Sequence, residues 1–234
     1  MSSRPTCAGT ASLRVFCTAI KVHDTPEDVT QLLRARVSEP AIVFGHSLGG
    51  NVAMWIGSHS PELVRGLILG DNMIIVRRLR NPMYTALFSG LRELAKQGGS
   101  VEQIAEGIGR IVLPVPGGNE SVHIHDLPGN DEAYLRSWAR CVQQADPETY
   151  EMMLDGSSLE GWNGETVLRG IGCATLLLQG STELGGLMSD ADVALASRLL
   201  PHHAHVRFRN LGHALFIQQP EPVLRAVTNF LESL

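Results

Sequence analysis

The chain has 234 residues, a formal net charge of −5 at pH 7 and 44% hydrophobic residues. This length accommodates one α/β domain, or a core domain with a subdomain, and is ample to bury a hydrophobic core. No basic tract stands out, which argues against nucleic acid or an anionic membrane as a partner. No segment approaches the ~18 apolar residues of a membrane span, and the first residues lack the apolar centre of a signal peptide. We therefore expect a soluble, cytoplasmic protein.

Metal and cofactor sites have little support in the sequence. The four cysteines show no Cys-x-x-Cys spacing, which argues against a zinc site or a disulfide framework. His123, His125 and Asp126 would suit a metal, but they lie in a Pro/Gly-rich segment without a further ligand, which favours a surface loop. Because no nucleotide loop, flavin motif or metal motif occurs, the sequence predicts no cofactor and no metal. It carries no signal of oligomeric state.

Strands and helices alternate over the first third of the chain. Thr25-Pro26 followed by two acidic residues is typical of a helix start, with Pro at the first helical position. Because strands separated by helices pair in parallel, this alternation predicts a parallel sheet. The expected elements are a strand at 13–22, a helix from 25 to about 37, a strand from 40 that leads to Ser47, a helix at 51–58 and a strand at 63–69.

Residues 73–170 interrupt the alternation with a series of helical patterns. We interpret this segment as an inserted helical cap, and residues 1–72 and 171–234 as the α/β core. The helices expected in the cap are at 83–96, 101–111, 132–144 and 147–154. The core then resumes with a strand at 174–179, a helix at 190–200, a strand at 205–208 and an amphipathic helix at 220–234.

The most informative motif is Gly45-His46-Ser47-Leu48-Gly49, between a predicted strand and a predicted helix. This arrangement is typical of a nucleophile elbow, in which a sharp turn holds a Ser in a strained backbone conformation. We expect Gly45 and Gly49 to be required, because larger side chains at either position would collide with the turn. His46 is interpreted as a packing or turn residue. The motif predicts that Ser47 is a catalytic nucleophile.

His213 is the histidine whose position suits a general base for Ser47. A Ser hydroxyl at its ordinary pKa is a poor nucleophile and needs a His within hydrogen-bond reach. Of the nine histidines, His213 follows the predicted strand at 205–208 and precedes the last helix. Because catalytic groups of α/β sheets gather at the carboxyl ends of the strands, we expect His213 to lie near Ser47.

From about Asp24 to Leu234 the chain resembles the α/β-hydrolase fold family, in its Ser-nucleophile, helical-cap branch. The resemblance implies an α/β fold with a mostly parallel sheet, helices on both faces, an inserted cap and a Ser-His-acid triad. It also implies that the backbone N–H of Leu48 stabilises the oxyanion. The family's order of nucleophile, acid and histidine is carried by the segments EPAIVFGHSLGG, VRGLILGDN, ATLLLQGSTELGG and LGHALFIQQPEPVLRAVTNFL.

The resemblance leaves two candidates for the acid. The usual acid lies three residues past a Gly after the strand that follows the cap, and Glu183 fits that position. A minority of related enzymes place the acid after the strand that follows the elbow helix, where Asp71 fits. Either carboxylate would hold the His213 ring in one tautomer and stabilise its charged form. We favour Glu183 and keep Asp71 as the alternative.

The start of the chain departs from the family pattern. Members normally carry several strands ahead of the elbow, and a His-Gly loop there donates a second N–H to the oxyanion. Only 46 residues precede Ser47, and His-Gly does not occur among them. We therefore expect an N-terminally truncated fold with an incomplete oxyanion hole, which would lower the rate by on the order of 10²–10³. Missing strands would also leave the strand at 41–44 as an exposed edge, unless residues 13–22 occupy the place beside it.

Two hypotheses for function follow. The first is a serine hydrolase that cleaves a carboxylic ester, lactone, thioester or activated C–C bond of a small-molecule substrate. Apolar residues of the cap, such as Phe88 and Trp138, indicate an apolar substrate, although they serve equally well as the cap's own core. The alternative is a weakly active or inactive relic, or a binding module, that keeps the fold without a complete oxyanion hole.

Overall fold

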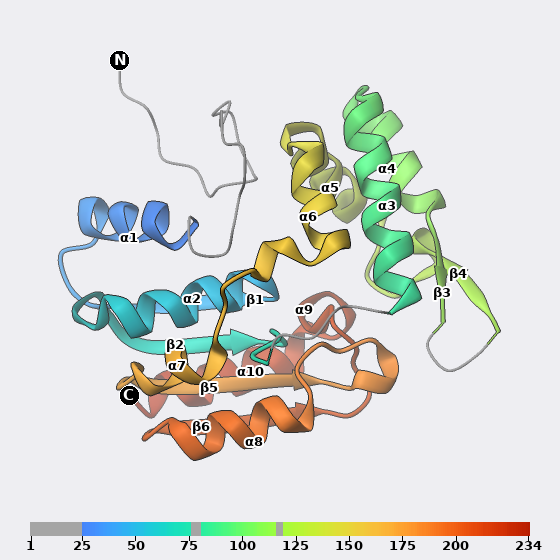
Figure 1. The fold of residues 1–234 in the computed structure, drawn as a ribbon. Coiled ribbons are helices and arrows are strands. Elements are labelled where there is room, and N and C mark those ends of the chain that lie inside the picture. The colour runs from blue at the N-terminus through green and yellow to red at the C-terminus, as the bar shows by residue number, and fades with distance from the viewer. Residues whose placement is uncertain (1–24, 76–80, 116–118) are drawn as a thin grey trace. The chain divides into compact units, whose positions relative to one another are not determined.

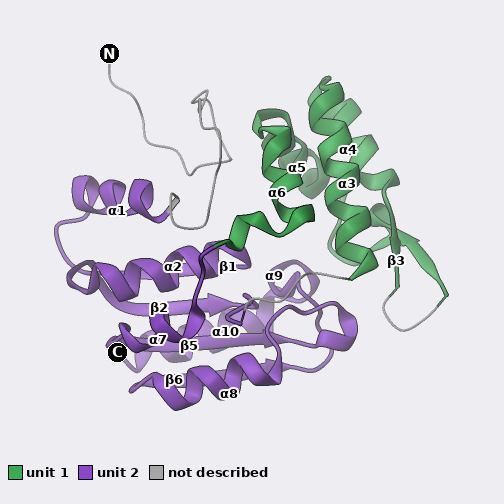
Figure 2. Cartoon of the chain, viewed as in Figure 1, with its two compact units in different colours: residues 1–21, 78–160 green, residues 22–77, 161–234 purple. Residues whose placement is uncertain are grey.

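The computed structural model describes residues 25–75, 81–115 and 119–234 and divides them into two compact units (Figures 1 and 2). Of the described residues, one unit contains 25–75 and 161–234, and the other contains 81–115 and 119–160. The strand expected at 13–22 lies outside the described residues. It stays a prediction that residues 73–170 act as a cap.

The larger unit is built on a four-stranded parallel sheet. Its strands follow the order β1-β2-β5-β6 and pair in parallel throughout. Strands β2 and β5 are apolar along nearly their whole length, as expected of strands covered on both faces. Their bounds are β1 Ala41–His46, β2 Val64–Gly70, β5 Ala174–Gly180 and β6 His203–Phe208.

Helices cover both faces of this sheet (Figure 1). On one face α2 packs against β1 and β2, and α7 contacts both α2 and α8. On the other face, residues of α9 and α10 share a buried cluster with Ile68 and Leu176. The predicted α/β fold with a mostly parallel sheet is confirmed. The helices of this unit are α1 Thr25–Arg36, α2 Leu48–His59, α7 Gly164–Arg169, α8 Asp190–Leu199, α9 Leu215–Gln218 and α10 Pro220–Glu232, with 3-10 helices η1 Pro61–Leu63 and η4 Thr182–Leu184.

The smaller unit packs four helices around its own core. The N-cap side chains of Asn81, Ser100, Asp131 and Asp146 each accept a backbone N–H at the start of one helix. Leu91, and the fully buried Ile108 and Val142, belong to the shared core. The elements are α3 Pro82–Gln97, α4 Val101–Arg110, β3 Val112–Pro114, β4 Ser121–His123, η2 Ile124–Asp126, α5 Glu132–Gln144, α6 Pro147–Asp155 and η3 Ser157–Leu159.

The helices expected between 83 and 154 are present, but the antiparallel pair β3–β4 was not expected. Each of these strands has three residues, too few to show an alternating pattern, and they flank a Pro/Gly-rich segment that resembles a loop. His123 therefore lies at the end of a strand rather than in a loop. The helices α7 and α9 were not predicted either, because they are too short to show a helical pattern in the sequence.

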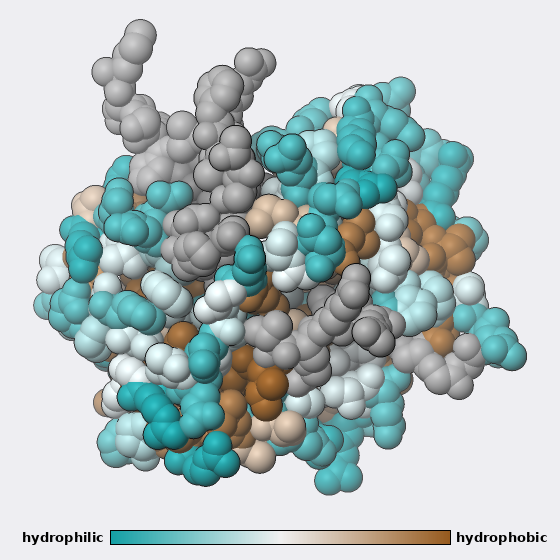
Figure 3. Space-filling model, viewed as in Figure 1, coloured by the Kyte–Doolittle hydropathy of each residue, from teal (hydrophilic) through white to brown (hydrophobic). Residues whose placement is uncertain are grey.

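The described surface shows mainly hydrophilic and intermediate residues on the face drawn in Figure 3, with hydrophobic residues in smaller patches. Within the described sheet, β1 pairs with β2 alone, and Phe44 on β1 is 49% exposed. Residues 13–22, the alternative neighbour expected beside the strand at 41–44, lie outside the described residues. Among the described helices, none combines the length and the apolar character needed to cross a bilayer.

Candidate active site

Ser47 occupies a strained turn between β1 and α2. Its backbone has φ 55° and ψ −128°, a conformation that non-glycine residues rarely adopt. The turn is held from both sides, because the Ser47 N–H donates to the Gly70 carbonyl at 2.9 Å and the Ser47 carbonyl accepts the Gly50 N–H at 2.9 Å. The predicted strand, sharp turn and helix are therefore present at Ser47.

The glycines of the motif are not equally necessary. A Cβ added to Gly45 would lie 2.1 Å from the Gly49 carbonyl oxygen, so a side chain is excluded there. At Gly49 an added Cβ meets no atom within 4 Å, so the expected collision at this position is wrong. The crowded residue is Gly50, where a Cβ would lie 2.6 Å from the Cβ of Asn72. The tight approach therefore involves the first turn of α2 and the segment after β2.

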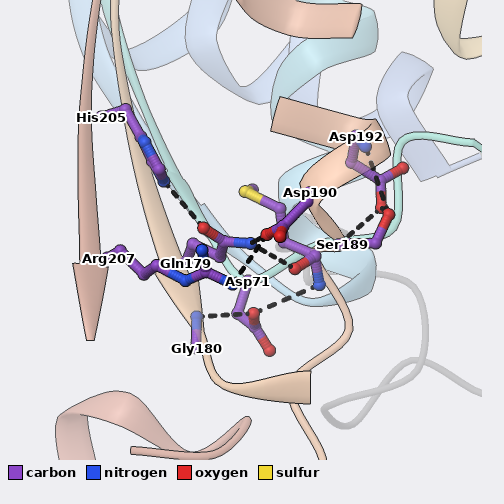
Figure 4. A network of polar contacts seen from close by, with 9 residues as sticks. Asp71, Gln179, Gly180, Ser189, Asp190, Asp192, His205 and Arg207 are labelled. Atoms are coloured by element: carbon purple, nitrogen blue, oxygen red, sulfur yellow. Dashed lines mark hydrogen bonds and ion pairs between the residues drawn. The ribbon is translucent and has the colours of Figure 1, made fainter. Parts of the chain in front are cut away.

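Asp71 lies directly after β2, beside the elbow in the sheet, and is fully buried. It is the other described non-glycine residue with positive φ, at 44°. Its Oδ1 accepts the N–H group of Gly180 at 2.9 Å (Figure 4). Oδ1 also accepts the N–H of Met188 at 3.2 Å, and Oδ2 accepts the N–H of Leu187 at 2.8 Å. A buried carboxylate is costly unless such donors surround it. Asp71 is therefore held as a hydrogen-bond acceptor on both oxygens.

His213 lies between β6 and α9 and contacts Asp71. Its Nδ1 is 2.7 Å from Asp71 Oδ2. Because both Asp71 oxygens accept hydrogen bonds, Nδ1 of His213 carries the proton in this contact. In a neutral ring this leaves the lone pair on Nε2, which is the tautomer that a general base requires.

Glu183, the acid favoured from the sequence, does not make this contact. It is exposed within η4, and no hydrogen bond or ion pair joins it to His213 in the described part of the chain. The carboxylate that meets the histidine is the alternative, Asp71, and the favoured Glu183 makes no such contact. Which of the two acids serves a triad stays a prediction. The family spacing indicated Glu183, after β5, as the acid. Spacing along the chain could not show that Asp71, after β2, is the buried carboxylate.

The Ser47 hydroxyl and His213 are not hydrogen-bonded within the described contacts. Such bonds are often long in ligand-free enzymes and tighten in the complex. The adjacent residue, His46, does reach His213, because its Nε2 lies 2.8 Å from the His213 carbonyl oxygen. The two rings are 4.5 Å apart between centroids, with a tilt of 32°. The elbow and the His213 loop therefore meet at the carboxyl ends of the strands, as expected.

The electrostatic setting of His46 differs from that of an ordinary histidine. Burial, and secondarily the neighbouring His213, lower the pKa of His46 to about 4. His46 is therefore neutral at pH 7. Because a backbone carbonyl can only accept, its contact with His213 fixes the proton on Nε2. The interpretation of His46 as a packing or turn residue did not include this hydrogen bond, because its two partners are far apart in the sequence.

Leu48 is the first residue of α2. Its N–H therefore has no intrahelical acceptor and lies at the positive end of the helix dipole. This is the setting expected of an oxyanion donor. The second donor was expected to be lacking among the 46 residues ahead of Ser47, of which residues 1–24 lie outside the described part of the chain.

A polar network holds the loop that supplies the donors to Asp71 (Figure 4). The amide Nε2 of Gln179, buried at the end of β5, donates to the Met188 carbonyl at 3.1 Å and to Asp190 at 2.9 Å. Arg207 of β6 pairs with Asp190 at 2.8 Å, and Nε2 of His205 lies 2.9 Å from the side-chain oxygen Oε1 of Gln179. A polar residue at the end of an otherwise apolar strand was the available sequence signal for Gln179.

A second carboxylate fixes the segment that follows Asp71. Asp192 is fully buried and accepts the N–H groups of Ile74 and Ile75, at 3.2 and 2.6 Å. It also forms a capping box with Ser189 at the start of α8, the helix predicted at 190–200. The described residues contain no group of three His, Cys, Asp or Glu that could hold a metal ion.

A profile of the alpha/beta hydrolase family matches residues 3–226 of the chain. No curated protein matches the sequence. Solved structures do match: an N-formylmaleamic acid deformylase from Pseudomonas putida S16 is 15% identical, with a TM-score of 0.71 over 94% of this chain and 78% of that one. An E-2-(acetamidomethylene)succinate hydrolase is 21% identical, with a TM-score of 0.60 over 92% and 75%. An N-acyl homoserine lactone degrading enzyme is 18% identical, with a TM-score of 0.60 over 95% and 80%. At these identities the likeness shows the fold.

The elbow geometry predicts different responses at its two glycines. Gly45→Ala is expected to cost at least about 3 kcal/mol in the free energy of unfolding, because the new Cβ collides with backbone that cannot move independently. Gly49→Ala, the matched control, is expected to change it by less than about 1 kcal/mol. Urea unfolding followed by circular dichroism measures both. Equal losses in the two variants would contradict the elbow geometry.

The lowered pKa of His46 predicts a pH-dependent loss of stability. Between pH 6.5, the ordinary pKa of a histidine, and about pH 4, the His46 side chain is protonated in the unfolded chain but neutral in the native state. Acidification over this range therefore favours unfolding. From pH 7 to pH 4 this group should remove about 3 kcal/mol from the free energy of unfolding. The measurement is the difference in unfolding free energy between wild type and His46→Gln at several pH values. A difference that stays constant with pH would show that His46 titrates normally.

Proposed function

The chain belongs to the alpha/beta hydrolase family, and on this premise we propose that it is a serine hydrolase with Ser47, His213 and Asp71 as its triad. The observation that carries the proposal is the 2.7 Å contact between His213 Nδ1 and the buried Asp71 carboxylate. It selects the His213 tautomer whose Nε2 can accept a proton. The strained elbow at Ser47, at the same end of the parallel sheet, supplies the hydroxyl that would give that proton up.

The proposed reaction follows the two halves of acyl transfer. The Ser47 Oγ attacks the carbonyl carbon of the substrate while its proton passes to Nε2 of His213, and Asp71 stabilises the imidazolium. The N–H of Leu48 donates to the oxyanion that forms. When the intermediate collapses, His213 returns the proton to the leaving group and an acyl group stays on Ser47. A water molecule, deprotonated by His213, then releases the acid and restores the Ser47 hydroxyl.

The proposed substrate is a small molecule with a carboxylic ester, lactone, thioester or activated C–C bond. The similar structures support cleavage at an acyl group, since they include a deformylase and an N-acyl homoserine lactone degrading enzyme. We propose no metal and no organic cofactor in this reaction, since Ser47, His213 and Asp71 cover nucleophile, base and acid. Nucleic acid and membrane are not proposed as partners.

The first test concerns the nucleophile. We expect wild type to hydrolyse p-nitrophenyl acetate above the buffer rate, and Ser47→Ala to lower kcat by at least about 10³-fold. Ser137→Ala, which removes an exposed hydroxyl from α5, is the matched control and should leave the rate unchanged. Equal inertness of folded wild type and Ser47→Ala would instead favour the relic or binding module.

The second test compares the two acids. Asp71→Asn would place an amide NH₂ where Oδ2 accepts the Leu187 and His213 protons. His213 would then adopt the tautomer that is protonated on Nε2 and cannot accept a proton there. We expect kcat to fall by about 10³–10⁴-fold in Asp71→Asn and by less than about twofold in Glu183→Gln, whose exposed side chain makes no contact with His213. Circular dichroism checks that both variants fold. The reverse ranking would return the acid to Glu183.

A further inference from the structure

We propose that His46 is a positioning residue for His213: its Nε2–H holds the His213 carbonyl and thereby places the His213 ring against the elbow. The inference rests on the proposed serine hydrolase function, which it deepens. It assigns a task to the middle residue of the Gly-His-Ser sequence that the proposed reaction does not use. His46 touches no reacting atom, so its effect would pass entirely through His213.

The bond joins parts of the chain that are far apart in both sequence and sheet. His46 is the last residue of β1, at one edge of the described sheet, whereas His213 follows β6 at the opposite edge. The distance from His46 Nε2 to the His213 carbonyl oxygen is 2.8 Å. Since Ser47 follows His46 directly, this hydrogen bond connects the nucleophile's own strand to the backbone of the base.

Packing fixes the His46 ring in the orientation that makes this bond. One face of the ring lies 4.5 Å from His213, measured between centroids. Phe216, from α9, meets the His46 ring edge-on at 5.3 Å and 88°, and meets Phe44 in the same manner at 5.1 Å. Gly70 completes the enclosure, since a Cβ there would lie 3.3 Å from His46 Cδ2. The ring therefore has little freedom to turn away from His213.

The His213 backbone lacks the support of regular structure, which gives the bond its importance. His213 lies outside the described strands and helices, and its carbonyl also accepts the Leu215 N–H at 2.9 Å. Asp71 holds one point of the residue, the ring Nδ1, and His46 holds the carbonyl as a second point. Anchors at opposite ends of one residue restrict the direction of Nε2, and a misplacement of about 1 Å can cost 10²-fold in rate.

The neutrality of His46 suits this position. The imidazolium that forms on His213 during the reaction would be repelled by a second charge at 4.5 Å. Burial keeps His46 uncharged at pH 7, so the ring donates a hydrogen bond without opposing the transition state. A Lys or Arg could donate the same bond, but only with a permanent charge beside the base.

Two variants of His46 separate the hydrogen bond from the packing. His46→Gln can place an amide N–H where Nε2 lies, because both side chains have the same number of bonds from Cβ to that nitrogen, but it loses the ring. His46→Phe keeps the ring contacts with His213 and Phe216 but loses the donor. We expect His46→Phe to lower kcat for p-nitrophenyl acetate about tenfold with KM nearly unchanged. His46→Gln should stay within about threefold of wild type.

A second readout does not depend on turnover. The Nδ1 proton of His213, bonded to Asp71, is followed by NMR and assigned by its loss in His213→Gln. In His46→Phe we expect this proton to exchange with water about tenfold faster, and in His46→Gln to behave as in wild type. If wild type shows no hydrolysis, the proposed function fails, and the NMR comparison still decides the role of His46.

Several outcomes would overturn the inference. Equal kcat in wild type and His46→Phe would show that the donor is dispensable. Equal losses in His46→Phe and His46→Gln would assign the effect to shape rather than to the hydrogen bond. An unchanged Nδ1 proton signal in folded His46→Phe would show that His213 is placed without His46.

Discussion

The Asp71 carboxylate connects the loops that meet at the carboxyl ends of the strands in the larger unit. It accepts the N–H groups of Gly180 at the end of β5, of Leu187 and Met188 in the loop before α8, and of the His213 ring after β6. A fully buried carboxylate that loses such partners typically costs about 3–5 kcal/mol. The burial of Asp71 and the position of His213 therefore depend on each other, because the His213 ring is one of the donors that the buried carboxylate requires.

The parallel sheet brings the participants to this point. The ladder of hydrogen bonds continues past the strand ends, since the Ser47 N–H donates to Gly70 and the Asp71 N–H donates to Leu178. Both Ser47 and Asp71 then leave the sheet with positive φ. These two strained turns lie side by side and place both residues at the carboxyl ends of the strands, where the His213 loop also lies. Such strain is retained where the surroundings over-determine it, and functional sites are its usual location.

The sequence predicted those features that depend on short, local patterns. The Gly-x-Ser-x-Gly motif located the elbow, and alternating strands and helices predicted the parallel sheet.

Features that depend on burial or on contacts between distant segments were not predicted from the sequence. Glu183 and Asp71 both occupied plausible positions along the chain. The burial of Asp71, its three backbone N–H donors and its 2.7 Å contact with His213 distinguish it from the exposed Glu183. The necessary glycine in the first turn of α2 is Gly50 rather than Gly49, because the crowding comes from Asn72 on another segment. The bonds of His46 and Gln179 are likewise contacts between segments far apart in the sequence.

The central claim is that Ser47 is a nucleophile activated by His213 under the control of Asp71. Mass spectrometry after reaction with a fluorophosphonate tests it most directly, because the reagent bonds to an activated serine with loss of fluoride and needs no knowledge of the substrate. We predict a single covalent adduct on the peptide that contains Ser47, formed at least about 10² times more slowly in His213→Gln and in Asp71→Asn. An unlabelled Ser47 in the folded protein, or labelling at the same rate in all three proteins, would contradict the account.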